Sequence, residues 1–570
     1  MTEETTALLE RAEAALLAGD AAGALAALDQ LPETAAGVSL AHYFRAAALF
    51  ATGEAAAGEQ ALAQGRHLHA LGTIEAAGGD VARLAADPAY AYEVGRRFYN
   101  AKQMVPAAVA FAFAGATHSP QSAQAVQLYG EALHYEGRAQ EAATAFAAAY
   151  RLEPGVRRHC LYVYSQFFLP DGARRHAGAA RAWARQWADP FTPARPSFLV
   201  ERRGDRRLRI GYVAPSFTTN QTRKFFHPLL EAHDPEAAEI FLYVDRAADE
   251  RAPAHVQLRS IKDLLPGDVA EQIRRDRIDI LVDVWGHAAG NVLQAFALKP
   301  APVQASWLNY MQTTGLSAMD AVLHGDFMDA PGKAELFTEA IWDLGPVTGL
   351  FQPDPHAELS PSPAEARGHV TFASFNHPAK LSLESLQAWA RILKACPTAR
   401  LKFKYAPFED PILQAQLQVR FLGWGVAPAR LEFEGHSTGP DYERAFAEID
   451  LALDPSPCPG GTTTLEAFSR GVPVLTLDSG DFYARIGVQP MMALGLPEMV
   501  ATDWDDYVAK AIALADDIPR LARLRAEIRP RFDASAYRDG PAFARRLEDV
   551  YRRLFQHWLA REGATREKAA

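Results

Sequence analysis

Short apolar segments alternate with helical segments along the chain from residue 206 onward. A Pro-rich, polar stretch at 351–368 interrupts this alternation, which resumes after it. Strands that alternate with helices indicate a parallel, doubly wound sheet, so the sequence predicts two similar α/β lobes. The expected strands are RLRIGYVAP, EIFLYVD, DILVDVWG, PVQASWL and AVLHGD in the first lobe, and HVTFASFN, RLKFKYAP, RLEFEG, DLALDP and VPVLTLD in the second.

The preceding 155 residues are rich in Ala and Leu and have helical periodicity. A weak spacing of 34 residues separates Gly19 from Gly53, each of which follows an apolar helix end. The segment LYGEALHYEGRAQEAATAFAAAYRLEP (128–154) resembles one tetratricopeptide repeat, a helix–turn–helix unit. The period is interrupted between 65 and 90, and an irregular helical domain is the alternative interpretation. Stacked repeats would bury a shared face and present a concave surface to polypeptides.

These differences in composition and periodicity divide the chain into six segments. We expect helical repeats at 1–155, a helical connector at 156–205, a first α/β lobe at 206–350, a linker at 351–368, a second α/β lobe at 369–535, and a C-terminal helix and tail at 536–570. The connector is expected to pack on the first lobe through Trp183 and Trp187. The helix at 540–560 is expected to pack across the lobes.

The composition argues against several classes of protein. A net charge of -11 gives no reason to expect a nucleic-acid partner. The three cysteines, Cys160, Cys396 and Cys458, have no CxxC spacing, so neither a zinc site nor a disulfide framework is indicated. The N-terminal segment has no basic and apolar regions of the kind found in signal peptides, and no window approaches ~18 consecutive apolar residues. We therefore expect a cytoplasmic protein without a membrane span.

The strongest chemical signal is DLALDPSPCPGGTTTLEAFSRGVPVLTLD at 450–478. A Pro/Gly loop follows a strand, Gly461 allows close backbone approach, and a helix then begins. The residues that open this helix are Thr462, Thr463 and Thr464. Free N–H groups and hydroxyls at a helix start form an anion site, which suits a nucleotide phosphate, and Glu466 is placed to accept hydrogen bonds from ribose hydroxyls. Simple N-capping by threonine is the alternative.

This segment resembles the nucleotide-sugar motif of the O-GlcNAc transferase and SPINDLY family, and further similarity extends over roughly 206–535. It includes FASFNHPAKLSLESLQAWARILKACP, APVQASWLNYMQTTG and DVWGHAAGN. The resemblance implies tetratricopeptide-like helical repeats followed by a two-lobed GT-B catalytic region. It also implies an inverting protein O-glycosyltransferase that transfers a sugar from a nucleotide sugar to Ser or Thr of a protein held by the repeats. Flagellin is a candidate acceptor.

The resemblance also implies roles for individual residues. Lys380 would contact the donor diphosphate and neutralise the charge that builds up on the leaving phosphate, with Asn376 close by in the same segment. Ser437 would lie near the nucleobase, and Tyr442 would stack on it. The acceptor-side residues would be His287, Tyr310, Gln312, Thr313 and Gly315. No metal or other cofactor is expected, and the nucleotide of the donor is left open among uridine, guanosine and cytidine.

The first lobe departs from the family pattern at several positions, including Met311 and Gln312, which stand where the family's inter-lobe loop usually has Pro and Gly or Asn. Ser216 and Asn220 stand where the family usually has Asp and His, and Asn220 cannot be a general base because an amide does not titrate. In one interpretation Asn220 positions donor or acceptor, and the proton leaves through water or phosphate. In another, Arg223 and Lys224 bind an acidic group on an unusual donor sugar. A third is an inactive transferase-like adaptor that acts through its repeats.

Overall fold

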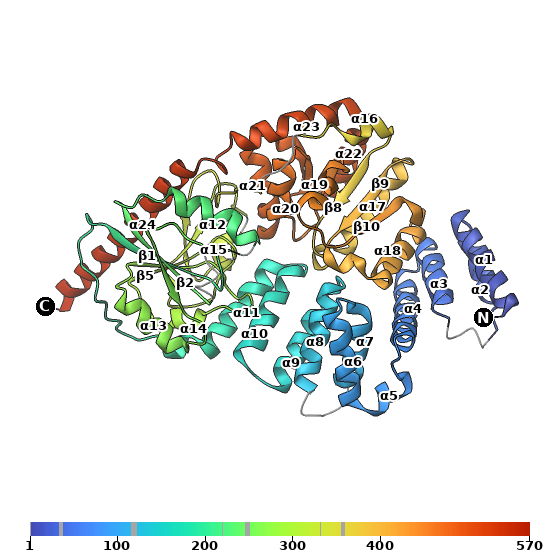
Figure 1. The fold of residues 1–570 in the computed structure, drawn as a ribbon, viewed down its shortest axis with the longest axis horizontal. Helices are drawn as coiled ribbons and strands as arrows, with labels where there is room; N and C mark the ends of the chain where they lie inside the picture. The colour runs from blue at the N-terminus through green and yellow to red at the C-terminus, as the bar shows by residue number, and fades with distance from the viewer. Residues whose placement is uncertain are drawn as a thin grey trace.

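The computed structural model describes residues 2–32, 38–115, 122–218, 220–245, 251–330, 332–354 and 359–569. A helical arm leads through a helical connector into two α/β lobes that face each other, and the C-terminal helix returns along the first lobe (Figure 1). This architecture confirms the predicted fold class, helical repeats followed by two parallel-sheet lobes.

The arm consists of short helices joined mostly by tight turns. Its helices are α1 (Glu3–Leu17), α2 (Ala21–Leu28), α3 (Ser39–Ala51), α4 (Ala55–Ala76), α5 (Val81–Ala86), α6 (Pro88–Asn100), α7 (Met104–Gly115), α8 (Ser122–Tyr135) and α9 (Ala139–Leu152). In three pairs a glycine of one helix receives an aromatic ring of the other, because a Cβ at Gly58, Gly95 or Gly130 would lie only 2.6–2.9 Å from a Phe ring. The long α4 and the short α5 occupy the region where the sequence period breaks.

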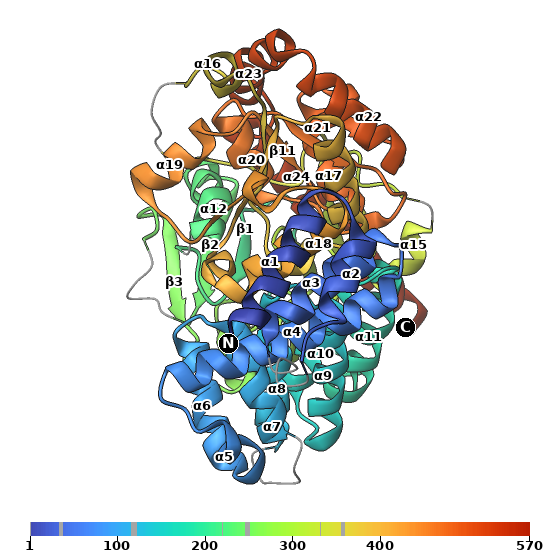
Figure 2. The same cartoon turned by 90° about the vertical axis from the view of Figure 1, so that its right-hand side faces the viewer.

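The connector and the arm both contact the lobes. The connector contains α10 (Val156–Ser165) and α11 (Gly172–Trp187), and Trp183 of α11 is fully buried against the first lobe. The ring of Phe167, which lies between these helices, is 4.2 Å from that of Tyr483 in the second lobe. Further along the arm, α3 and α4 pack on α18 (Pro411–Gly423) of the second lobe, where Arg420 forms a bidentate ion pair with Glu59. Figure 2 shows α3 and α4 beside α18 from a second direction.

Both sheets are entirely parallel. The first has the order β3-β2-β1-β4-β5-β6-β7 and the second β10-β9-β8-β11-β12-β13. The first-lobe strands are β1 (Leu208–Val213), β2 (Ala238–Val244), β3 (Val256–Ser260), β4 (Ile280–Asp283), β5 (Val303–Trp307), β6 (Ala321–His324) and β7 (Ala340–Asp343). The second-lobe strands are β8 (Thr371–Ser374), β9 (Arg400–Lys404), β10 (Leu431–Glu434), β11 (Leu451–Leu453), β12 (Val474–Leu477) and β13 (Val500–Ala501).

Helices cover the sheets and connect successive strands. The first lobe has α12 (Asn220–Ala232), α13 (Pro266–Arg275), α14 (Leu293–Ala297) and α15 (Lys333–Leu336). The second lobe has α16 (Pro363–Arg367), α17 (Leu383–Ala395), α18, α19 (Gly439–Ala447), α20 (Thr462–Ser469), α21 (Arg485–Ala493), α22 (Trp504–Ala515) and α23 (Ile518–Asp533). The loops at the carboxyl ends of the strands in the two lobes border the site described below, as is usual in doubly wound sheets.

The C-terminal helix α24 (Gly540–Ala569) differs from the expectation that it packs across the lobes. Its first turns pack on α12 and β5 of the first lobe, with the ring of Phe543 stacked 6.0 Å from that of Trp307. The chain crosses between the lobes in the segment that precedes the helix, where the N–H of Phe351 donates to the Tyr537 carbonyl at 2.9 Å. The aromatic side chains of α24 determine this position because they complete the first-lobe core.

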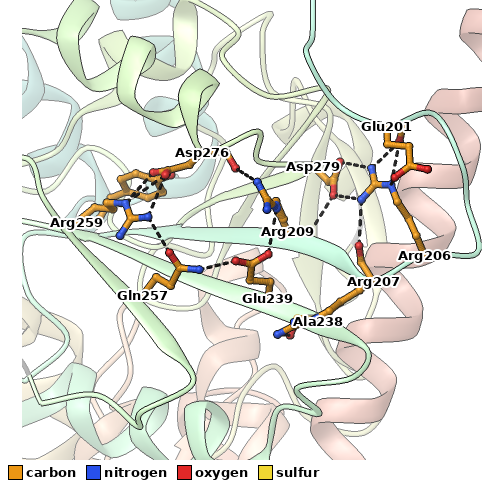
Figure 3. Close-up of polar contacts among 11 residues, drawn as sticks. Glu201, Arg206, Arg207, Arg209, Ala238, Glu239, Gln257, Arg259, Asp276 and Asp279 are labelled. Carbon is orange, nitrogen blue, oxygen red and sulfur yellow. Dashed lines mark hydrogen bonds and ion pairs between the residues drawn. The ribbon is translucent and has the colours of Figure 1, made fainter.

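A charged network closes the opposite, amino-terminal edge of the first sheet (Figure 3). Arg206, directly after the connector, donates to both carboxylate oxygens of buried Asp279 at 2.6 Å. Asp279 also accepts from the N–H of Arg209 at the start of β1. The bidentate pair fixes the point at which the chain enters the sheet.

Candidate active site

A cavity of about 570 Å³ lies between the lobes and borders the arm. Its walls include Lys102, Met104 and Tyr135 of the arm, Arg223 and Lys224 of α12, Asp354 of the linker, and Phe375, Lys404, Tyr405, Ser437, Tyr442, Thr462, Thr463 and Glu466 of the second lobe. Cations outnumber carboxylates among these residues, so the cavity suits an anionic ligand. We call it the inter-lobe cavity.

One end of the inter-lobe cavity is formed by the start of α20 and the segment before α17. The Lys380 ammonium donates to the Pro459 carbonyl at 2.8 Å, and the Thr463 hydroxyl lies 3.4 Å from the Asn376 side-chain oxygen. Lys380 stands in a short 3-10 turn that the His377 ring caps by accepting from the N–H of Ala379. The structure therefore brings Lys380, Asn376 and two of the three threonines together.

Gly461 and Thr464 differ in what they contribute at this helix start. Gly461 is the N-cap of α20 and lines two further cavities that border Lys380, both described below. The Thr464 side chain instead points into the protein, where it is 2% exposed and its hydroxyl has no hydrogen-bond partner in the described structure. Thr462 and Thr463, with the free N–H groups of the helix start, are thus the groups that face the cavity.

Asp454 is a residue of this region to which the sequence pattern assigned no role. It follows β11, is 3% exposed, and accepts a hydrogen bond of 3.1 Å from the N–H of Gly460. Burial raises the pKa of the Asp454 carboxyl to about 6, although the Gly460 N–H and the charge of Lys380 act in the opposite direction. The carboxyl thus holds the Pro/Gly loop in front of Lys380.

Replacing Asp454 by Asn is expected to change how stability depends on pH. The pKa of Asp454 is higher in the folded than in the unfolded chain. The contribution of the Asp454 side chain to folding stability is therefore fully present at low pH. This contribution is lost as the pH rises from about 4 to about 6. The stability difference between Asp454→Asn and the wild type, measured by urea unfolding, should shift in favour of the variant over this interval. A difference that does not change with pH would contradict the assignment.

Glu466 connects the two lobes. Its side chain forms an ion pair with Lys224 of the first lobe and accepts a hydrogen bond from the Tyr442 hydroxyl. Lys224 also lies 2.8 Å from Asp354, which pairs in addition with Arg223. Burial raises the pKa of Asp354, but the hydrogen bonds from Lys224 and Arg223 outweigh this effect and hold it below its ordinary value. Arg223 and Lys224 are therefore both paired with carboxylates.

The other end of the inter-lobe cavity contains a buried lysine that the sequence did not reveal. Lys404 ends β9, and its ammonium donates to Glu434 and Ser437 at 2.6 Å each. It also lies 5.8 Å from the centre of the Tyr442 ring. Ser437 and Tyr442 thus lie on the wall of one cavity, and Lys404 contacts both. The signal for Lys404 was its place as the last of three basic residues that alternate with apolar ones along RLKFK, at the carboxyl end of the strand.

The residues predicted for the acceptor side separate into two groups. Tyr310 and Gln312 line a second cavity of about 240 Å³ that also borders Lys380 and Thr462. His287, Thr313 and Gly315 do not line the three cavities described here. The His287 ring lies 4.9 Å from that of Trp183, Thr313 donates to Glu339 at 2.6 Å, and a Cβ on Gly315 would lie 2.5 Å from the backbone of α11. His287 and Gly315 thus pack against the connector, whereas Thr313 is held by the segment that precedes β7.

A third cavity, of about 600 Å³, leads from Lys380, Thr462 and Thr463 to the concave side of the arm. Its arm side includes Tyr99, Glu131, His134 and Tyr135, and Arg157 of the connector also lines it. The ring of His134 lies 4.9 Å from that of His377, and burial lowers the pKa of both imidazoles, so two neutral rings pack here. The arm therefore contacts the turn that carries Lys380. We call this space the arm cavity.

Three further expectations concern a side chain outside the described residues or an absence. The side chain of Asn220 lies outside the described part of the chain, although its backbone begins α12. Among the described residues, no group of three or more His, Cys, Asp or Glu side chains is arranged to hold a metal ion. Within the same residues, no helix has the length and apolar character needed to cross a membrane.

Comparison with known proteins places this geometry in a family. The model of glycosyl transferase family 41 matches residues 194–342 and 363–547. The probable UDP-N-acetylglucosamine–peptide N-acetylglucosaminyltransferase SPINDLY of Solanum lycopersicum is 32% identical over 396 residues, which are 67% of this chain and 42% of that protein. The probable transferase SEC of Arabidopsis thaliana is 26% identical over 70% of this chain and 40% of its own length. The chain thus spans about two fifths of these curated relatives.

A solved structure is similar over its whole length. A mutant of the O-GlcNAc transferase of Thermobaculum terrenum aligns with 99% of this chain and 100% of its own, with a TM-score of 0.74 and 29% sequence identity. The match of the family model covers more than half of the 570 residues, including both lobes and the segments that carry Lys380 and Thr462. The chain belongs to glycosyltransferase family 41.

Proposed function

We propose that this glycosyltransferase acts on proteins, by inverting, metal-independent transfer of a sugar from a nucleotide sugar to a Ser or Thr hydroxyl of a polypeptide held against the arm. The observation that carries the proposal is the meeting of three cavities at Thr462, two of which also border Lys380. Thr462 borders all three, and Lys380 borders the second cavity and the arm cavity. A donor in the inter-lobe cavity and a polypeptide in the arm cavity would meet at these two residues.

Donor binding would follow the electrostatics of the inter-lobe cavity. The diphosphate would lie at the start of α20, where free N–H groups and the hydroxyls of Thr462 and Thr463 meet the positive end of the helix dipole. The base would extend toward Ser437 and Tyr442. In the structure both oxygens of the Glu466 carboxylate already bind Lys224 and Tyr442. The ribose hydroxyls would therefore share this carboxylate with Lys224.

The chemical step needs a stabilised leaving group more than a strong base. The acceptor oxygen would form a bond to the anomeric carbon while the bond from that carbon to the phosphate oxygen breaks. The nucleoside diphosphate leaves, and the hydroxyl proton passes to water or to phosphate. Lys380 and the N–H groups of α20 would stabilise the charge that develops on the leaving phosphate. Asn220 would position a group, because its amide cannot accept the proton.

The pairing of Arg223 and Lys224 favours a neutral donor sugar over an acidic one. Both cations already pair with Asp354, and Lys224 also pairs with Glu466. An acidic sugar would have to displace these carboxylates. The names of the relatives contain UDP-N-acetylglucosamine and peptide, so this donor and a polypeptide acceptor are the first pair to test. The three cysteines are free thiols, which supports a cytoplasmic location.

The test is transfer by the full chain. UDP-N-acetylglucosamine, GDP-fucose and a cytidine-linked acidic sugar are each incubated with the enzyme and with candidate acceptors that include flagellin. The expected result is donor consumption and a mass increase of one neutral sugar on a Ser or Thr, measured by mass spectrometry. A chain that binds nucleotide but transfers no sugar to any polypeptide would contradict the proposal and favour the adaptor interpretation.

A further inference from the structure

The turn between α6 and α7 differs from the other tight turns of the arm. In three helix pairs the first residue after the C-cap is a glycine with positive φ, namely Gly19, Gly53 and Gly137 at 78°, 84° and 83°. In the α6–α7 turn this position is Lys102, with φ 63°. Its backbone makes the same hydrogen bonds, since its N–H donates to Tyr99 and that of Gln103 donates to Phe98. A left-handed residue other than Gly costs about 1 kcal/mol.

The strained residue lines the inter-lobe cavity. The first turn of α7 is held against the second lobe, because the N–H of Val105 donates to the Asp410 carboxylate at 3.2 Å and Asp410 also caps α18. The same contact brings Lys102 and Met104 to the cavity wall that includes Ala406 and Pro407. Strained residues that persist at a cavity are candidates for a role in binding.

Lys102 also differs from the other cations of this wall in its partners. Arg223 and Lys224 pair with Asp354, and Lys404 pairs with Glu434. In the part of the chain that the structure describes, the Lys102 ammonium has no carboxylate partner within ion-pair distance. It is therefore the wall cation best able to bind an anionic ligand without breaking an existing ion pair.

We propose that Lys102 binds the nucleotide of the donor, so that the repeat arm forms the outer wall of the donor site as well as the acceptor path. The inference rests on the proposed function, because it takes the inter-lobe cavity as the donor site. Lys102 shares the wall of this cavity with Ala406, Pro407 and Ser437, and the hydrogen bond from Val105 to Asp410 holds the first turn of α7 on the second lobe. Its ammonium would therefore bind oxygen atoms at the base and ribose end of the nucleotide, and its charge would also attract the diphosphate.

The test uses a variant that relieves the strain while it removes the ammonium. In full-length Lys102→Gly, the Kd for UDP or GDP should rise about fivefold at low salt, as measured by calorimetry. The increase should shrink as salt is raised. The melting temperature should be equal to or above that of the wild type, because glycine adopts the positive φ of this turn without steric strain. Lys102→Arg should keep most of the affinity, and Lys262→Asn, at an exposed lysine of the first lobe, should bind as the wild type does.

The outcomes separate this inference from the proposed function. If the wild type binds UDP or GDP and Lys102→Gly binds it equally well, the inference about Lys102 is overturned. The assignment of the inter-lobe cavity as the donor site is then retained. If Lys102→Gly loses affinity together with melting temperature and Lys102→Arg does not restore it, the role is structural and the inference is also overturned. If the wild type binds none of UDP, GDP and CMP, both the assignment of the inter-lobe cavity as the donor site and the inference about Lys102 are overturned.

Discussion

Lys380→Ala is expected to lower kcat for sugar transfer by about 10²–10³-fold while the protein remains folded. The Lys380 side chain donates to a loop carbonyl at the start of α20 and borders the second cavity and the arm cavity. Loss of one group that stabilises a leaving phosphate typically has an effect of this size. Single-turnover rates with radiolabelled donor measure the step directly, and circular dichroism checks the fold.

The matched control for Lys380→Ala is Lys394→Ala, at an exposed lysine near the end of α17. This variant should transfer sugar at the wild-type rate, because its ammonium lies on the outer face of the second lobe. Turnover by Lys380→Ala equal to that of the control would remove Lys380 from the mechanism. A change confined to KM would assign it to ground-state binding instead of to the transition state.

Lys224→Met is expected to destabilise the two lobes by about 3–5 kcal/mol, because it leaves the buried Glu466 carboxylate without its cation. Both side chains are at most 6% exposed. Urea unfolding followed by intrinsic fluorescence measures the shift. The double variant Lys224→Met with Glu466→Gln should regain much of the loss, since no unpaired charge then remains at Glu466.

Arg223→Met is the control for Lys224→Met. Arg223 precedes Lys224 on the same helix and pairs with the same Asp354, but its side chain is 38% exposed. Its removal should cost no more than about 1 kcal/mol. Equal losses in the two single variants, or no recovery in the double variant, would show that the Lys224–Glu466 pair contributes little to joining the lobes.

The parallel sheets could be predicted from the sequence because their central strands are continuous apolar runs. The missed strands β3, β7 and β13 all lie at sheet edges, and two of them, VQLRS and AIWD, are largely solvent-accessible along their length. An edge strand is covered less completely, so it does not need an apolar run. The C-terminal helix shows a related limit, since amphipathic periodicity predicts a helix but not the lobe on which it packs.

The candidate site could be predicted where its residues are close in sequence. The phosphate end is formed largely by one continuous loop and helix start, so Thr462 and Thr463 were recognisable. Lys102 and Tyr135 lie in the arm, hundreds of residues from Ser437, and only the tertiary structure places them on the same cavity. Conversely, Thr313 and Gly315 belong to a recognisable loop, but Gly315 packs against α11 of the connector and Thr313 binds Glu339 within the first lobe.

The contacts of the arm have a mechanical consequence. The arm joins the second lobe at α18, the connector joins the first lobe at Trp183, and the lobes join each other at Lys224 and Glu466. Three bodies linked pairwise in this way form a closed triangle, which a hinge at a single corner cannot open. Widening the gap between the lobes requires α18 to slide along α3 and α4, or the arm to bend. The curvature of the arm and the width of the gap between the lobes therefore cannot change independently of each other.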